Sequence, residues 1–136
     1  MGYPGERCER MADILVVEDE ADIRELIVFQ LGHDGHEVRA VADGTAALDA
    51  VASRLPDVIV LDWGLPKLPG PQVCRRVRAM PGAGRIGVLM LTVRITDAEV
   101  AECLAAGADE FMAKPFDLNE LRARIDALLA RSRGGS

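Results

Sequence analysis

The sequence lacks the features that mark several classes of protein. No apolar run approaches the roughly 20 residues that a membrane-spanning helix requires, and the first ten residues contain no apolar stretch typical of a secretory signal. The three cysteines form no Cys-x-x-Cys pair, which argues against a zinc site or a disulfide framework and favours reduced thiols in the cytoplasm. Basic charge is also scarce: 16 Lys and Arg stand against 22 Asp and Glu, and the net charge of −6 argues against direct binding of nucleic acid.

The 136 residues are the usual size of one domain, and 49% of them are apolar, which is enough to bury one hydrophobic core. No repeat or low-complexity segment divides the chain. We expect a flexible leader over residues 1–11 and a single domain over residues 12–131. Residues 132–136 are expected to form a C-terminal tail or the start of a linker, because Gly and Ser favour a flexible chain.

Short apolar runs alternate with amphipathic stretches throughout this domain. The runs predict strands at residues 13–19, 36–42, 58–61, 87–91 and 110–113. Apolar residues at helical spacing predict helices at residues 21–33, 45–54, 71–80, 97–106 and 118–131. Five strand–helix units of this kind predict an α/β domain with a doubly wound parallel sheet, strand order 2-1-3-4-5, as in flavodoxin-like folds.

Polar side chains end four of the five predicted strands. The first strand ends in Glu18 and Asp19, the third in Asp62, the fourth in Thr92, and the fifth in Lys114. Ligands of doubly wound sheets bind at the carboxyl ends of the strands, where the strand order reverses between strands 1 and 3. We therefore expect these side chains to converge on one site.

Three carboxylates packed together repel one another, so one would keep its proton at neutral pH unless a cation compensates. Mg²⁺ fits best, with Mn²⁺ as the alternative, because it takes oxygen ligands and is usually bound by one or two carboxylates plus phosphate oxygens. Lys114 supplies a second cation. This combination favours phosphoryl transfer to a carboxylate nucleophile, Asp62. The other interpretation of Asp19 is an N-cap of the following helix, which does not require the adjacent Glu18.

Four motifs occur in order and at compatible spacing: VVEDE (16–20), VLDWGLPKLPG (60–70), MLT (90–92) and MAKPF (112–116). With them, residues 12–131 resemble the receiver domain of two-component response regulators. The resemblance implies that Asp62 accepts a phosphoryl group. It also implies that Mg²⁺ is held by Asp19 and Asp62, by Glu18 through water, and by the backbone carbonyl of Gly64.

The same resemblance assigns roles to the remaining strand ends. Thr92 would be the switch hydroxyl, and Lys114 would contact the phosphoryl group. Phe111 would be the aromatic side chain that turns inward when the threonine moves, and the bond before Pro115 would be cis. The expected partner is a sensor histidine kinase or a phosphotransfer protein. The domain would be a cytoplasmic signalling switch rather than a turnover enzyme.

Several residues around the acceptor are expected to modulate the site. Val93 stands where the family usually has a small residue, and its stiff side chain should narrow access to the acceptor or restrict Phe111. Gly64 leaves no side chain where relatives often carry one that modulates phosphoryl lifetime, and Arg94 is the candidate to cover that gap. Trp63 is expected to pack beside the site or to contact a partner.

The last predicted helix resembles receivers that control winged-helix DNA-binding domains. Those receivers dimerise through the face formed here by residues 97–106, 110–113 and 118–131, and we expect phosphorylation-dependent dimerisation. The residues that fit its ion-pair pattern are Asp109, Glu110, Glu120 and Arg124. Val100 replaces the usual basic residue, so one ion pair between subunits would be missing.

Two other functions are open at this level. A hydrolase of the haloacid-dehalogenase type also uses an Asp nucleophile and Mg²⁺, but it needs a second acid two residues further on, where this chain has Gly64. A degenerate receiver that acts as a phosphorylation-independent scaffold is supported only by Val93 and Gly64. The switch therefore ranks first.

Overall fold

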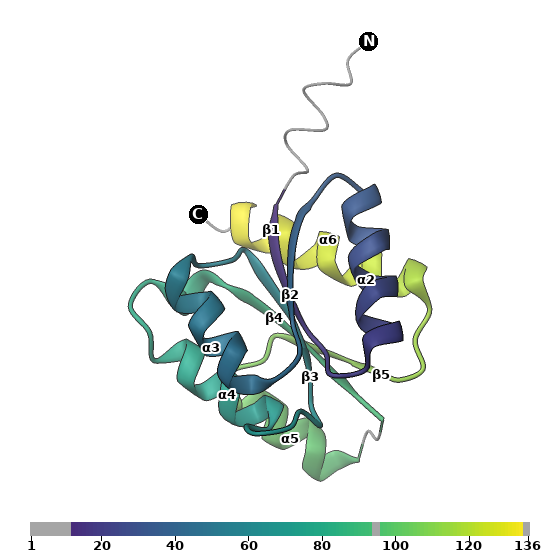
Figure 1. Ribbon diagram of the computed structural model, residues 1–136. Coiled ribbons are helices and arrows are strands. Elements are labelled where there is room, and N and C mark those ends of the chain that lie inside the picture. Colours follow the sequence, from purple (N-terminus) through teal and green to yellow (C-terminus); the bar gives the residue numbers. More distant parts are fainter. Residues whose placement is uncertain (1–11, 94–95, 135–136) are drawn as a thin grey trace.

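The computed structural model describes residues 12–93 and 96–134, and a five-stranded sheet lies at its centre (Figure 1). The strands are β1 (Asp13–Val17), β2 (Glu37–Val41), β3 (Val58–Asp62), β4 (Gly87–Thr92) and β5 (Glu110–Ala113). All neighbouring strands are parallel, and their order is β2-β1-β3-β4-β5, which confirms the predicted fold class and topology. The predictions for residues 1–11, Arg94 and residues 135–136 lie outside the described residues.

The helices lie where their apolar spacing predicts them. They are α2 (Ala21–His33), α3 (Gly44–Ser53), α4 (Gly70–Arg78), α5 (Asp97–Ala106) and α6 (Leu118–Gly134). Helix α6 continues past the predicted end at residue 131. The short 3₁₀ helix η1 (Ala83–Arg85) was not predicted, because three residues are too few to show a helical period.

Each face of the sheet is covered by its own helices. Figure 1 shows α2 and α6 on one face and α3, α4 and α5 on the other. Alternate strand residues therefore enter two separate hydrophobic clusters: Leu15 and Ile59 face α3 to α5, whereas Ile14 and Val58 face α2 and α6. Because strands β1, β3 and β4 are covered on both sides, they read as continuous apolar runs in the sequence.

Two of the cysteines belong to the core. Cys74 on α4 and Cys103 on α5 lie fully buried in the cluster that faces α3 to α5. Burial raises the pKa of the Cys103 thiol to about 11, and burial also raises the pKa of Cys74. Both side chains therefore act as small apolar groups, as expected for thiols of this kind.

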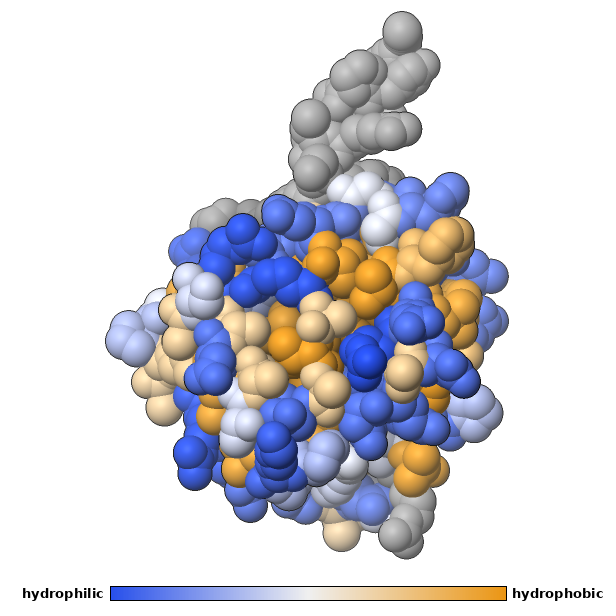
Figure 2. Space-filling view, in the orientation of Figure 1, coloured by the Kyte–Doolittle hydropathy of each residue, from blue (hydrophilic) through white to orange (hydrophobic). Residues whose placement is uncertain are grey.

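The surface in Figure 2 carries mostly hydrophilic side chains around a smaller hydrophobic area in the middle of the view. Figure 1 places β2, an edge strand of the sheet, in this area. Val38 and Val41 on this strand are only half-buried, since no further strand covers them. Among the described residues, no helix is long and apolar enough to cross a membrane.

Candidate functional site

The carboxyl ends of four strands meet around one cavity of about 270 Å³. Its walls are formed by Asp19, Glu20, Asp62, Trp63, Gly64, Thr92, Val93 and Lys114. These residues come from β1, β3, β4 and β5 or from the loops that follow them. The polar side chains at the strand ends therefore converge on one site, as the sequence predicts.

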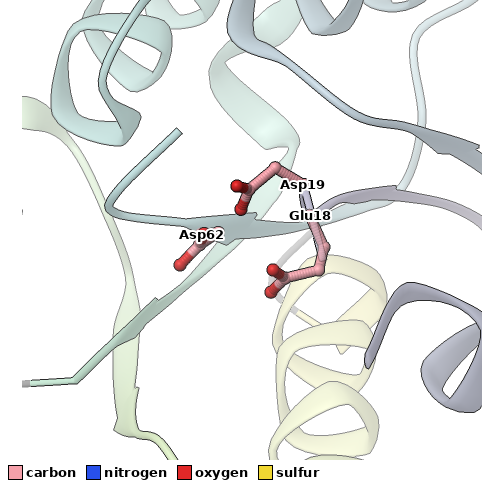
Figure 3. A group of neighbouring side chains, drawn as sticks. All are labelled: Glu18, Asp19 and Asp62. Carbon is pink, nitrogen blue, oxygen red and sulfur yellow. The ribbon is translucent and has the colours of Figure 1, made fainter. Parts of the chain in front are cut away.

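Three carboxyl groups form the acidic part of the site. Glu18 and Asp19 extend from the end of β1 and Asp62 from the end of β3 (Figure 3). One oxygen atom from each lies within 4.8 Å of the others. Glu18 is 0% exposed and Asp62 is 5% exposed, whereas Asp19 is exposed. The N-cap of α2 is Glu20, so Asp19 does not cap that helix.

Lys114 connects the two buried acids. Its ammonium donates to Glu18 Oε1 at 3.0 Å and to Asp62 Oδ1 at 3.2 Å. The second oxygen of Glu18 accepts a hydrogen bond from Glu20 N at 3.1 Å. Three carboxylates against one ammonium leave two negative charges uncompensated at the site. The peptide bond between Lys114 and Pro115 is cis, as the family resemblance implies.

The pKa values of these groups follow from burial and from each other's charges. Burial raises the pKa of Asp62, and the charge and hydrogen bond of Lys114 offset only part of that rise. Burial likewise raises the pKa of Glu18 despite its bonds to Glu20 N and Lys114. Burial opposes the charge of Lys114, but Glu18 and Asp62 outweigh it and raise the pKa of the ammonium. Lys114 is therefore a fixed cation.

Arg24 is a residue of the site that the sequence analysis missed. From the first turns of α2 it donates through Nη1 to Glu18 O at 2.9 Å and to Asp19 O at 3.5 Å. These bonds fix the backbone that carries both acids. The sequence feature that could have identified Arg24 is its position in the first turn of the helix that follows the two acids. A long side chain at that position reaches back over the start of the helix.

The predicted switch residues lie at different depths. Thr92 is 5% exposed at the end of β4, and its carbonyl accepts a hydrogen bond from Lys114 N at 2.8 Å. Val93 is 72% exposed at the rim of the cavity. Phe111 is half-buried on β5 against the hydrophobic cluster and does not line the cavity. Trp63 lies in the cavity wall, next to Asp62 in the chain.

The residues predicted for a dimer face all form ion pairs within this chain. Arg124 bonds Glu110 at 2.8 Å and Glu120 at 2.9 Å. Asp109 pairs with Arg78 at 2.9 Å. Val100 is half-buried on α5, and this helix carries no Lys or Arg.

Asp62→Asn should stabilise the domain in metal-free buffer near neutral pH, because it removes a buried charge next to Glu18 and Asp19. We expect Tm to rise by roughly 2–5 °C. Since folding raises the pKa of Asp62, the penalty is present above the folded pKa and fades as the pH falls through it. The difference in Tm should therefore shrink on acidification, which differential scanning calorimetry can follow.

The control is Asp49→Asn, which neutralises an exposed carboxylate on α3 and should leave Tm nearly unchanged. Equal stability of the wild type and Asp62→Asn at neutral pH would contradict this account of the acidic cluster.

Two curated proteins resemble this chain in sequence. The phosphate regulon transcriptional regulatory protein PhoB of Rhizobium meliloti is 41% identical over 120 residues, 88% of this chain and 53% of that protein. The response regulator MprA of Mycobacterium tuberculosis is 44% identical over 121 residues, 88% of this chain and 51% of that protein. The chain thus spans about half the length of these relatives.

The solved structure of the chemotaxis response regulator CheY4 of Vibrio cholerae has a TM-score of 0.84 at 31% identity, covering 88% of this chain and 99% of that one. A family model described as the response regulator receiver domain matches residues 14–126. This match takes in β2 to β5, all of β1 except Asp13, and every residue around the cavity, so the chain belongs to the receiver domain family of two-component response regulators.

Proposed function

We propose that Asp62 accepts a phosphoryl group from a sensor histidine kinase or a phosphotransfer protein and that this modification switches a binding face. The observation that carries the proposal is the position of Lys114, whose ammonium bridges Asp62 and the buried Glu18 at 3.2 and 3.0 Å. A cation held there favours the ionised form of the acceptor, the form that a nucleophile needs, and faces the charge that develops on a transferring group.

The donor set fits Mg²⁺, with Mn²⁺ as the alternative. Carboxylate and carbonyl oxygens are ligands of hard dications, and three such carboxylates lie within reach of one ion. Asp19, Asp62 and the carbonyl of Gly64 would hold it directly. Both oxygens of Glu18 already accept hydrogen bonds, so Glu18 would act through water. When bound, the ion would neutralise the two uncompensated charges and attract phosphoryl oxygens.

The transfer requires little from the protein beyond positioning and charge. An Asp62 carboxylate oxygen attacks phosphorus, the bond from phosphorus to the donor's imidazole nitrogen breaks, and the imidazole leaves with the electron pair. Lys114 and the Thr92 hydroxyl would then donate hydrogen bonds to phosphoryl oxygens. A phosphoryl group carries more negative charge than a carboxylate, so it would attract both donors more strongly.

The output would pass through the neighbouring strands. Phe111 lies on β5, in register with Met90 on β4, two residues before Thr92. A shift of Thr92 toward a phosphoryl group would leave space beside β5, and Phe111 would turn into it. The ends of α5, β5 and α6 would change together and expose a surface for a second copy of the chain. In a longer protein, this change would regulate transcription.

The alternatives lack support in the site. A hydrolase of the haloacid-dehalogenase type needs an acid where Gly64 has no side chain. A phosphorylation-independent scaffold would not require a buried acid pair held by a lysine, and buried charges of this kind reduce the stability of the fold. The proposed domain is a switch rather than a turnover enzyme.

Incubation with Mg²⁺ and acetyl phosphate should add one phosphoryl group to the wild type, because a small acyl phosphate can reach the cavity without a partner. Intact-mass spectrometry measures the gain directly. Asp62→Asn is the control and should gain nothing. An equal gain in the control would assign the acceptor to another residue, and no gain in a wild type that binds Mg²⁺ would exclude direct transfer from small donors.

Val93→Ala should raise the rate of phosphorylation by acetyl phosphate a few-fold, equivalent to a barrier lower by about 1 kcal/mol or less. Val93 stands at the cavity rim and is 72% exposed, so its truncation opens access without unpacking the core. Leu55→Ala truncates another exposed apolar side chain, just before β3 at the opposite edge of the sheet, and should leave the rate unchanged. Equal rates for Val93→Ala and the wild type would remove Val93 as a gate.

Phosphorylation should shift the chain from monomer to dimer, as measured by light scattering, because it would release the surface around α5, β5 and α6. Arg124→Glu should reduce the dimer fraction, since it reverses the charge that now pairs with Glu110 and Glu120. Asp62→Asn should stay monomeric with acetyl phosphate present. A monomer in both states of the wild type would count against this output.

A further inference from the structure

The loop between β3 and α4, residues 63–69, carries Gly64 into the cavity and is closed at its base. Gly70 N donates to Trp63 O at 2.9 Å, which joins the two ends of the loop. A Cβ atom on Gly70 would lie 2.6 Å from the backbone oxygen of Asp62, so the start of α4 touches the end of β3. The two ends of the loop, Trp63 and Gly70, are therefore held together and against the end of β3.

In its middle, the same loop makes a strained turn at Lys67. This residue has a φ of 70°, and it is the only non-glycine residue with positive φ in the described part of the chain. Leu68 N donates to Pro66 O at 2.8 Å, which closes a three-residue γ-turn around Lys67. The positive-φ form of this turn is rare, and contacts outside the turn are needed to maintain it.

Those contacts come from the N-terminus of α3. The ammonium of Lys67 lies 3.5 Å from Asp43 Oδ2, and Asp43 is the N-cap of α3 through a bond to Ala46 N at 2.8 Å. A Cβ atom on Gly44 would overlap with the backbone oxygen of Leu68 and would lie 2.6 Å from Leu68 Cβ. Since one of these atoms belongs to the backbone, it cannot rotate away as a side chain would.

We propose that the N-terminus of α3 positions the β3–α4 loop for metal binding, which makes Gly44 a positioning residue of a site that it does not line. This inference rests on the proposed function, because it takes the Gly64 carbonyl as a metal ligand. Any side chain at residue 44 must displace Leu68. The strained turn at Lys67 and the closed base at Gly70 leave the loop few ways to absorb that displacement before it reaches Gly64.

A titration with Mg²⁺ tests the proposal, followed by the fluorescence of Trp63 and by isothermal calorimetry. Trp63 is the single tryptophan of the chain and lies in the cavity wall, so its emission reports the site. Gly44→Ala should weaken Mg²⁺ affinity by roughly tenfold, the usual effect of losing support behind a metal ligand. Gly84→Ala is the matched control, because its Cβ would meet nothing within 4 Å.

Leu68→Ala provides a second test that does not depend on the folding of Gly44→Ala. It removes the buried side chain that seats the loop against the core, and it should also weaken Mg²⁺ affinity. Its matched control is Leu31→Ala, which truncates a buried leucine of α2 under the opposite face of the sheet. That control should lower Tm without changing the Mg²⁺ affinity of the folded protein.

The outcomes separate the inference from the proposed function. Unchanged Mg²⁺ affinity in Gly44→Ala and Leu68→Ala, with only Tm lowered, overturns the inference and leaves the proposed function intact. An equal loss of affinity in Leu68→Ala and Leu31→Ala also overturns it, because general destabilisation then explains the effect. A wild type that does not bind Mg²⁺ overturns the proposed metal site and the inference together.

Discussion

Glu18 and Asp62 can be buried side by side at the carboxyl ends of the strands because Lys114 lies between them. An ionised carboxylate with no exposure is strongly unfavourable unless it is paired and hydrogen-bonded. Lys114 reaches both acids from the end of β5, while the acids come from β1 and β3. The pairing therefore depends on a parallel sheet in which these strands end at the same edge.

This arrangement also determines what the site can respond to. Lys114 already neutralises one of the three carboxylates, and Arg24 holds the backbone of Glu18 and Asp19 rather than their charges. The site consequently favours species that bring positive charge or that offer new partners to Lys114. In the proposed function a phosphoryl group on Asp62 would compete with Glu18 for that ammonium. A change in charge at one strand end would then alter hydrogen bonds at two others.

The fold and the acidic cluster were predictable because they depend on local and periodic signals. Apolar runs and helical spacing identify the strands and helices, and parallel strands necessarily bring Glu18, Asp62 and Lys114 to one edge. The depth of each side chain was not predictable, because it depends on packing between distant segments. Thr92 and Phe111 were both predicted to belong to the switch, yet of the two only Thr92 lines the cavity.

The supports of the site were harder still to predict. Arg24 makes its contacts through backbone oxygens, which any residue supplies, so no pair of residue types marks it in the sequence. Gly44 reads as an ordinary helix start after an N-cap. Its close contact with Leu68, 24 positions later, exists only because α3 packs beside the β3–α4 loop. Contacts of this kind carry no periodicity and no charge pattern, so only three-dimensional structure reveals them.

The amino ends of the strands differ from the carboxyl ends in how completely their acidic side chains are paired. At the amino ends, Asp13 pairs with Arg39 at 3.2 Å and with Arg54 at 2.7 Å. Arg39 also donates hydrogen bonds to the carbonyls of Ala50 and Arg54 at the end of α3. The carboxylate of Asp13 thus has cationic partners on both oxygens, whereas the acids around Asp62 share one ammonium. The charge imbalance and the strained turn at Lys67 both lie at the carboxyl edge. A ligand that binds the folded chain and relieves this imbalance stabilises the fold by mass action, to an extent set by the ligand concentration relative to its Kd.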